Sequence, residues 1–327
     1  MKFNPIILLQ KIGLTYFVIF LLSAILLAWA MPDIGKSYPN FSLGDIASWG
    51  LCLIFFFYGL RLDFENIKKG LSNYKLHILV QIGTFVIFPI IGFIVYKFFV
   101  NETNHNLLLG VFFLCALPST VSSSVVLVAI AKGNIPAAIF NASISGIIGV
   151  FATPALMTLV VATSGASMEL GSVLLKLILQ VLVPVILGAC LNFKFGKWAI
   201  KNKKFFTLYD QIIILLIVYT SFCDSFANRM FEGISQSSII ILCIAMIALF
   251  FSVYGIIYTS SKFLKFENAD TTTALFCGSK KSLAHGAVMS KIIFANSNIL
   301  GIIILPTMIY HALQLVIVSI LAKKAQR

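Results

Sequence analysis

Two adjacent lysines, Lys280 and Lys281, stand in the middle of the apolar stretch Ala274–Phe294, which is about as long as a bilayer-spanning helix. One lysine at the bilayer centre costs roughly 2.5 to 3.5 kcal/mol on insertion scales, so a pair indicates that protein or water surrounds them. Such ammonium groups could bind an anionic substrate, exchange protons, or stand against the carbonyl ends of helices. Further polar side chains of this stretch are Ser279, Ser282 and His285.

A second apolar stretch, Leu107–Ala131, is interrupted in the same way. Pro118 removes a backbone donor there and favours an opened helix. Hydroxyl side chains follow the proline at Thr120, Ser122, Ser123 and Ser124. Opened backbone at membrane depth must line a cavity, and two interrupted helices, one in each half of a chain, indicate the substrate site of a transporter. The alternative is that the serines bond to their own helix or pack against a neighbour.

Several other polar residues keep two interpretations. His285 could relay protons or could be a hydrogen-bonded packing residue, and the packing role is favoured for His311 and Gln314. Asn141, in the following apolar stretch, could line the site or join helices. The roles of Lys280 and Lys281 need not be the same, because adjacent helical residues point about 100° apart.

The composition excludes an ordinary soluble domain. The 327 residues are 60% hydrophobic and 11% charged, whereas about a quarter of a soluble domain is charged. The net charge of +13 is spread between apolar stretches and is not the signature of a nucleic-acid-binding face. The six cysteines are scattered singly, without metal-ligand spacing, so neither a metal site nor a cofactor is expected. No enzyme motif is found, and the acidic residues all lie in loops or at the ends of apolar stretches.

Ten apolar spans connected by short loops are predicted, and the whole chain, 1–327, is expected to form one membrane unit. The spans are Gly13–Met31, Leu43–Leu62, Leu76–Phe98, Leu107–Ala131, Ile135–Val161, Leu170–Phe193, Thr207–Ala227, Ser238–Ser260, Ala274–Phe294 and Ile299–Leu321. One set of alternate loops holds 17 basic residues and the other holds only Lys36, Lys97, Arg229 and Lys291. The basic loops face the cytoplasm, so both termini are expected there, in an inner (plasma) membrane protein whose first span is not a cleaved signal.

The two interrupted spans are the fourth and the ninth, so each is the fourth span of a five-span half. Because five is odd, the second half enters the membrane upside down relative to the first. We therefore predict two inverted repeats, residues 1–163 and 164–327. A proline follows in the next span of each half, at Pro154 and Pro306.

These residues resemble the bile acid:sodium symporter superfamily over essentially the whole chain, and in particular its SBF-like branch with solute carrier family ten, member seven. The resemblance is carried by four blocks: Phe55–Leu60, Pro118–Val125, Ala137–Asn141 with Thr153-Pro154, and Phe276–Leu283. It implies ten helices, a core domain of spans 3–5 and 8–10 with crossing broken helices 4 and 9, and a panel domain of spans 1, 2, 6 and 7. The substrate cavity would lie between the two domains, which would move against each other.

The same resemblance gives Thr84, Ser123 and Ser124 as the equivalents of sodium-site positions. Phe276 stands where the sodium symporters carry a glutamate, and the lysine pair replaces Gln-Asn. A carboxylate is therefore lost and two cations are gained. We hypothesise that a lysine ammonium takes the electrostatic role of a sodium ion at the crossing.

The sequence thus predicts a secondary transporter of a small organic anion or amphipathic acid that works by alternating access. A proton or sodium is the candidate coupling ion, with sodium disfavoured by the loss of the carboxylate, and transport without a coupling ion is the alternative. Lysines without a carboxylate in the core favour a negatively charged solute. The alternative is a membrane regulator of cation homeostasis that keeps the transporter fold without transporting. The identity of the solute and the oligomeric state do not follow from the sequence.

Overall fold

The computed structural model describes residues 16–35, 43–62, 64–65, 68, 73–120, 122–161, 170–229, 232, 235–294 and 299–325, and every regular element in these ranges is helical. The first helices are α2 (Tyr16–Ala30), α3 (Pro32–Gly35), α4 (Leu43–Leu60), α6 (Tyr74–Ile82), the π-helical turn η1 (Gly83–Ile87), α7 (Phe88–Phe99) and α8 (His105–Ala116). The middle of the chain forms α9 (Ser122–Ile130), α10 (Ile135–Val161), α11 (Leu170–Leu177), the π-helical turn η3 (Ile178–Leu182) and α12 (Val183–Lys201). The last helices are α13 (Lys203–Ala227), α14 (Gln236–Phe263), α15 (Asn268–Gly278), α16 (Leu283–Ile293) and α17 (Leu300–Ala325).

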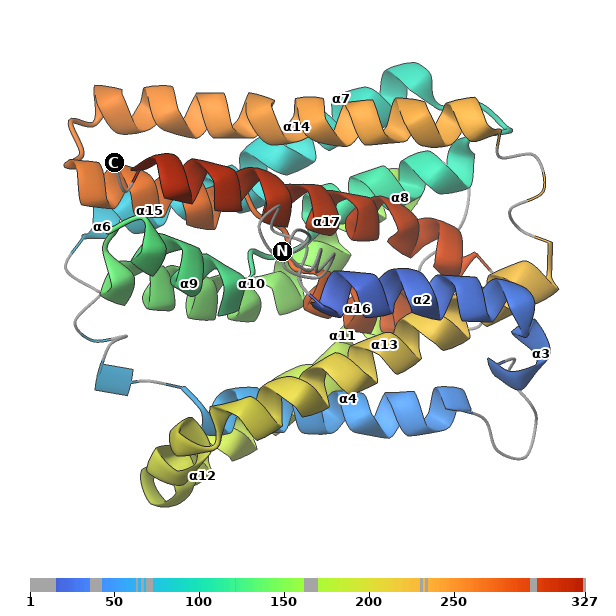
Figure 1. Cartoon of the computed structure of the whole chain (residues 1–327), viewed down its shortest axis with the longest axis horizontal. Coiled ribbons are helices and arrows are strands. Elements are labelled where there is room, and N and C mark those ends of the chain that lie inside the picture. The colour runs from blue at the N-terminus through green and yellow to red at the C-terminus, as the bar shows by residue number, and fades with distance from the viewer. Residues whose placement is uncertain are drawn as a thin grey trace, which may run out of the picture.

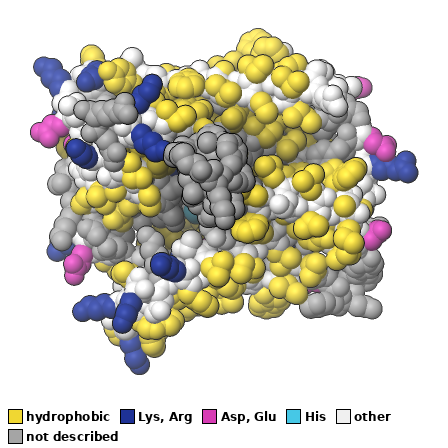
Figure 2. All heavy atoms as spheres, viewed as in Figure 1, with side chains coloured by type: hydrophobic (Ala, Val, Ile, Leu, Met, Phe, Trp, Pro, Cys, Tyr) yellow, Lys and Arg dark blue, Asp and Glu magenta, His cyan; other side chains and the backbone are white. Residues whose placement is uncertain are grey.

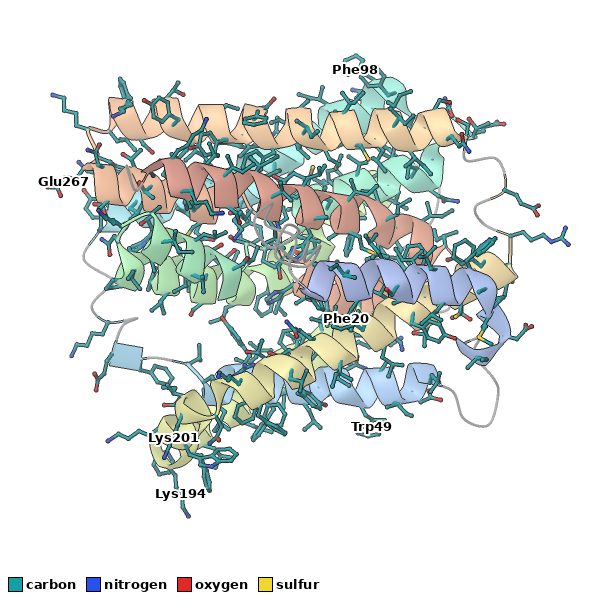
Figure 3. All side chains as sticks on the ribbon, viewed as in Figure 1. Phe20, Trp49, Phe98, Lys194, Lys201 and Glu267 are labelled. Carbon is teal, nitrogen blue, oxygen red and sulfur yellow. The ribbon has the colours of Figure 1, made fainter. Side chains whose placement is uncertain are left out.

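Seven helical stretches of the described residues are long and apolar enough to cross a membrane. Helices are expected here because the bilayer core offers backbone groups no partner outside the chain. A broad apolar belt covers the middle of the face in Figure 2, and charged side chains gather at its two ends. Phe20, Trp49 and Phe98 project outward from this surface, as membrane-facing side chains do (Figure 3). The count of ten spans remains a prediction, since the halves of a broken span are individually too short for this criterion.

The helices pack in two groups (Figure 1). Helices α2, α4, α12 and α13 pack against one another on one side. The second group consists of α6, α7, α8, α9, α10, α14, α15, α16 and α17. Helices α4 and α12 touch backbone to backbone: a Cβ atom on Gly59 would lie 2.0 Å from the Val185 carbonyl oxygen, and one on Gly188 would lie 2.0 Å from that of Phe56. Only glycine allows this approach, which makes α4 and α12 one rigid pair.

One carboxylate ties three helix starts together at the end of the molecule that carries Glu267 (Figure 3). The Asp270 carboxylate accepts hydrogen bonds from the side-chain amides of Asn73 and Asn134, the latter at 2.8 Å. Asn73 also caps α6, and Asn134 caps α10 through the backbone N–H of Ala137. Caps of this kind satisfy the free donors of a helix start, so the network fixes α15 relative to α6 and α10.

Candidate functional site

Both predicted interruptions are present. Helix α8 ends at Ala116 and α9 begins at Ser122, with Leu117 in an extended conformation (φ −69°, ψ 153°). Helix α15 ends at Gly278 and α16 begins at Leu283. The extended Ser282 caps α16, because its hydroxyl accepts a hydrogen bond from the backbone N–H of His285 at 3.2 Å. The expectation of two broken helices is therefore confirmed.

The two breaks contact each other directly. The Ser282 backbone N–H donates to the Pro118 carbonyl at 2.9 Å. In the other direction, the Ser119 hydroxyl donates to the Cys277 carbonyl, and the Ser124 hydroxyl to the Phe276 carbonyl at 3.3 Å. The free carbonyls at the end of α15 thus find donors in the opposite break, as buried backbone groups must. Ser119 is not among the hydroxyl residues singled out in the sequence, although it lies in the block Pro118–Val125.

Lys281 is 1% exposed, and its ammonium lies at the centre of this crossing. Its three hydrogens are matched by three backbone oxygens: those of Cys115 and Leu117, each at 2.7 Å, and that of Thr84 at 2.8 Å. It also stands 4.3 Å from the centre of the Phe88 ring. A buried charge with every donor used and an aromatic face beside it is stabilised much as a bound cation would be.

Local backbone geometry leaves all three oxygens available to accept from Lys281. Two of them belong to the carbonyl end of α8, where a helix leaves acceptors without partners and its dipole is negative. The third lies in η1, where the Phe88 N–H bonds to the Gly83 oxygen. In that register the next donor would be residue 89, a proline without an N–H, so the Thr84 oxygen has no backbone partner and accepts from Lys281 instead.

The Lys280 ammonium points elsewhere, although the side chain is also fully buried. It donates to the Ser123 hydroxyl at 2.8 Å. That hydroxyl is hydrogen-bonded to the Thr120 hydroxyl, which lies 3.4 Å from that of Ser124. Lys280 therefore opens a chain of three hydroxyl groups at the start of α9, and no carboxylate bonds to it in the described residues. Ser122 begins α9, but its side chain lies outside the described part of the chain.

Side chains of helix α17 bond to the backbone beside the lysine pair. The side chain of Gln314 accepts from the Lys281 backbone N–H at 2.9 Å and donates to the Lys281 carbonyl at 2.8 Å. Gln314 in turn contacts His311 at 2.9 Å, and the Tyr310 hydroxyl donates to the Ser279 carbonyl at 2.8 Å. The packing role favoured for His311 and Gln314 from the sequence fits this arrangement, which holds the unwound backbone in place.

His285 lies where α16 meets α4 and α10. Its Nδ1 is 2.9 Å from the Ser282 hydroxyl, and its ring packs edge-on to Phe55 and Tyr58 at 5.7 and 6.5 Å between centroids. The Tyr58 hydroxyl reaches the Ser143 carbonyl of α10 at 3.4 Å. His285 and Tyr58 thus bring polar atoms from both helix groups to one place. The sequence singled out the aromatic block around Tyr58 without assigning it to the site.

The side chains of Asn141, Thr84 and Ser279 bond elsewhere than to the two ammonium groups. Asn141 donates to Ala137 of its own helix at 3.0 Å and accepts from Gln81 at 3.3 Å, which matches the helix-joining alternative. The hydroxyl of Thr84 bonds to Val80 at 2.9 Å, so only its carbonyl serves the crossing. The hydroxyl of Ser279 likewise returns to its own helix, at 2.6 Å from the Leu275 oxygen.

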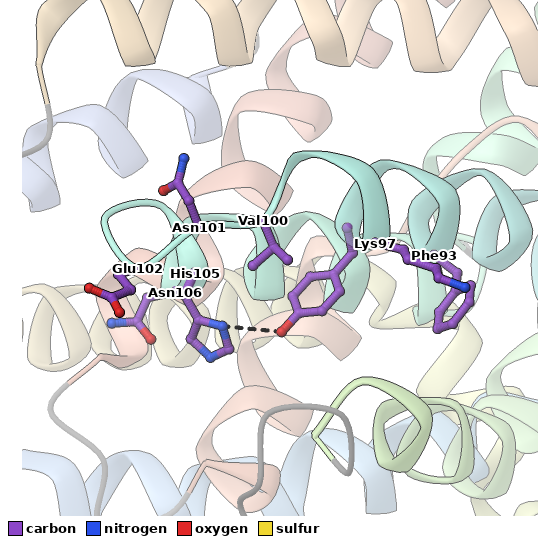
Figure 4. Close-up of a pocket in the computed structure, with 8 residues that line it drawn as sticks. Phe93, Lys97, Val100, Asn101, Glu102, His105 and Asn106 are labelled. Carbon is purple, nitrogen blue, oxygen red and sulfur yellow. Dashed lines mark hydrogen bonds between the residues drawn. The ribbon is translucent and has the colours of Figure 1, made fainter.

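A separate open pocket of about 710 Å³ lies where α7 ends and α8 begins (Figure 4). It is lined by Tyr96, Lys97, Glu102 and His105 among others, and the Tyr96 hydroxyl is 3.1 Å from His105 Nδ1. None of the predicted site residues lines it. Within the described residues, no group of three or more His, Cys, Asp or Glu side chains is placed to hold a metal ion.

Comparison with known proteins finds related sequences along nearly the whole chain. Residues 15–327 match the model of the SBF-like CPA transporter family. The chain is 35% identical over 311 residues to "Putative symporter YfeH" of Escherichia coli (strain K12), covering 95% of this chain and 92% of that protein. It is 33% identical over 320 residues to "Sodium/bile acid cotransporter 7-B" of Xenopus laevis, covering 96% and 92%. It is 32% identical over 320 residues to "Sodium/bile acid cotransporter 7" of Rattus norvegicus, covering 96% and 93%.

Proposed function

Since the chain belongs to the SBF-like CPA transporter family, and is therefore a membrane transporter of the bile acid:sodium family and not an enzyme, we propose that it carries a small organic anion or amphipathic acid by alternating access without needing sodium. The observation that carries this proposal is the pair of buried ammonium groups at the crossing of the two broken helices, with no carboxylate bonded to either in the described residues. Two lysine side chains at that depth, with no carboxylate bonded to them in the described residues, favour a negatively charged solute.

The contacts of Lys281 support the loss of sodium dependence. The backbone oxygens of Cys115 in α8, of Leu117 just after it and of Thr84 in η1 surround its ammonium, as oxygen ligands would surround a small cation. Of the positions that the family resemblance gives as sodium-site equivalents, Thr84 bonds to Lys281 and Ser123 to Lys280. A covalently attached cation neutralises the carbonyl ends of the half-helices without binding an ion from solution.

Lys280 is the better candidate for contact with the solute. The ammonium of Lys281 has used all three donors, whereas the described residues supply Lys280 with one hydrogen bond, to Ser123. Ser123 is partly exposed and belongs to the hydroxyl chain of Thr120 and Ser124, which could share a carboxylate or other anionic group with the ammonium. His285 and Tyr58 would face the solute from the boundary between the two helix groups.

Contacts between the helix groups at one end support alternating access. Lys291 of α16 donates to the Gly44 carbonyl at the start of α4, and the carboxylates of Asp45 and Asp224 attract its charge. Beside it, the backbone N–H of Gly301 donates to the Ser225 hydroxyl at 2.9 Å. This end is opposite the lysine-rich ends of α12 and α17 (Figures 1 and 2). We assign it as the outer gate, closed in this conformation.

The same charge distribution supports placing the chain in the inner (plasma) membrane with both termini in the cytoplasm. The division into inverted repeats, residues 1–163 and 164–327, with a core and a panel domain, is part of the proposal. It is supported by the two broken helices, each the fourth span of its half, and by the packing of α2, α4, α12 and α13 against one another.

Uptake into proteoliposomes tests the proposal. Purified protein is reconstituted without sodium, and a mixture of organic acids is offered outside, with the vesicle contents analysed by mass spectrometry. We expect at least one anion to accumulate above its level in protein-free vesicles. Absence of uptake for every anion, with correctly inserted protein, would favour the non-transporting regulator instead.

A further inference from the structure

The ends of α12 and α13 carry a dense positive charge without a matching negative one. Between Leu170 and Tyr209 the sequence contains six lysines and no acidic residue. Lys194, Lys197 and Lys201 follow one another at helical spacing near the end of α12 and are exposed. Figure 3 labels Lys194 and Lys201 at this corner, where Figure 2 shows a group of basic side chains.

The protein does not neutralise this charge in its described part. No ion pair is found there for Lys194, Lys197, Lys201 or the exposed Lys204 of α13. The next acid along the chain, Asp210, is bonded to Arg61 at 2.9 Å. Because unpaired like charges repel one another, a negatively charged partner would stabilise this corner.

An open hollow of about 810 Å³ lies at the turn between α12 and α13. Its lining is of two kinds: Lys201 and Lys204 supply charge, and Phe205 and Leu208 supply apolar surface. Phe205 and Leu208 are 60% and 56% exposed, and Ile212 continues the same face of α13 one turn further into the belt at 52%. Charge at the mouth and an apolar stripe running toward the membrane interior match an amphipathic ligand with an anionic head.

We infer that this hollow binds the headgroup of an anionic phospholipid of the cytoplasmic leaflet. Lys201 and Lys204 would contact the phosphate, and one acyl chain would lie along Leu208 and Ile212. The exposed Trp198, beside the lysines on α12, suits the same depth, since indole rings favour the membrane interface. A soluble anion such as inorganic phosphate would leave the apolar stripe unused, so the lipid is the better fit.

Lipid retention tests this site without any transport measurement. The full chain is reconstituted in nanodiscs of phosphatidylcholine and phosphatidylglycerol, extracted, and weighed by native mass spectrometry. We expect the wild type to keep phosphatidylglycerol in preference to phosphatidylcholine. Lys201→Gln with Lys204→Gln should weaken that binding about 30-fold, which corresponds to about 1 kcal/mol for each lysine near an anionic surface.

A matched control removes two lysines from the same leaflet, at the end of α17: Lys323→Gln with Lys324→Gln. This variant should retain the lipid within about two-fold of wild type, because neither lysine lines the hollow. Replacement of Lys201 and Lys204 by arginine should also retain it, which separates charge from folding. Equal loss in both glutamine pairs, no preference for the anionic lipid in the wild type, or displacement of the lipid by inorganic phosphate would overturn the inference.

Discussion

Replacing Lys281 with alanine removes one ammonium and leaves the three backbone oxygens of Thr84, Cys115 and Leu117 around an empty space. A buried acceptor that loses its donor costs about 1–3 kcal/mol. The sum of three such costs overstates the total destabilisation, because the variant no longer has to bury the charge of the lysine. We expect a destabilisation of about 3 kcal/mol, at the lower end of the range for removing one partner of a buried charged contact.

The same vacancy should admit a small cation. If the ammonium stands in for sodium, the alanine variant has room for the ion and three oxygens to bind it. At a sodium concentration about 100-fold above the dissociation constant, binding would return about 2.7 kcal/mol, most of the expected loss. The wild type, whose site is already filled by Lys281, should gain nothing.

Thermal unfolding of the purified variants measures this directly. Melting temperatures are compared in sodium chloride and in choline chloride of equal ionic strength. Lys281→Met serves as the matched control, because it removes the charge while its side chain fills the space. A sodium-specific rise in Lys281→Ala alone is expected. If sodium raises all three proteins equally, or none of them, the idea that the lysine replaces an ion is wrong.

Three further predictions concern the solute contact, the outer gate and the packing of the rigid helix pair. Lys280→Gln should lower anion uptake by about 10- to 100-fold, which corresponds to the free energy of one hydrogen bond to a charged group. The melting temperature should stay near that of the wild type. A large drop in both uptake and melting temperature would make Lys280 a structural residue. Cysteines at Ser225 and Gly301, in a background without native cysteines, should form a disulfide that stops uptake until it is reduced. A Cβ atom on Gly301 would lie 2.9 Å from that of Ser225 and needs only a small shift to reach the usual disulfide spacing of about 3.8 Å. Uptake that continues in the oxidised protein would contradict the gate. Gly188→Ala should unfold at a clearly lower temperature than the wild type, since its Cβ atom would clash with a backbone oxygen of α4. Gly255→Ala, whose Cβ atom would have no neighbour within 4 Å, should be neutral or stabilising. Equal melting temperatures for the two variants would disprove the close packing.

The broken helices and the unusual lysine pair could be predicted from the sequence because their signals are local. Polar residues inside an apolar span conflict with the bilayer wherever they stand, so Lys280, Lys281 and the hydroxyl run after Pro118 are visible in any single sequence. The two interruptions also fall at corresponding places in the two halves, and the family resemblance implies that the broken helices cross. Contacts between the breaks, such as that of Ser282 with Pro118, agree with this expectation.

The division of roles between the two lysines could not be predicted, because it depends on contacts far apart in the chain. The partners of Lys281 come from α8 and η1, and the availability of the Thr84 oxygen depends on a π-helical register followed by Pro89. No sequence pattern announces that register. The hydrogen bonds of Gln314 to the Lys281 backbone likewise join residues 33 positions apart. In the sequence, an isolated glutamine in an apolar span therefore indicated only a packing role.

The dependence of uptake on sodium tests the central claim most directly. Proteoliposomes that accumulate an anion are assayed with sodium on both sides, with an inward sodium gradient, and with choline in place of sodium throughout. If positive charge at the crossing is supplied by the protein itself, the initial rate should be the same in all three conditions. A rate that collapses in choline and rises with the sodium gradient would contradict the account.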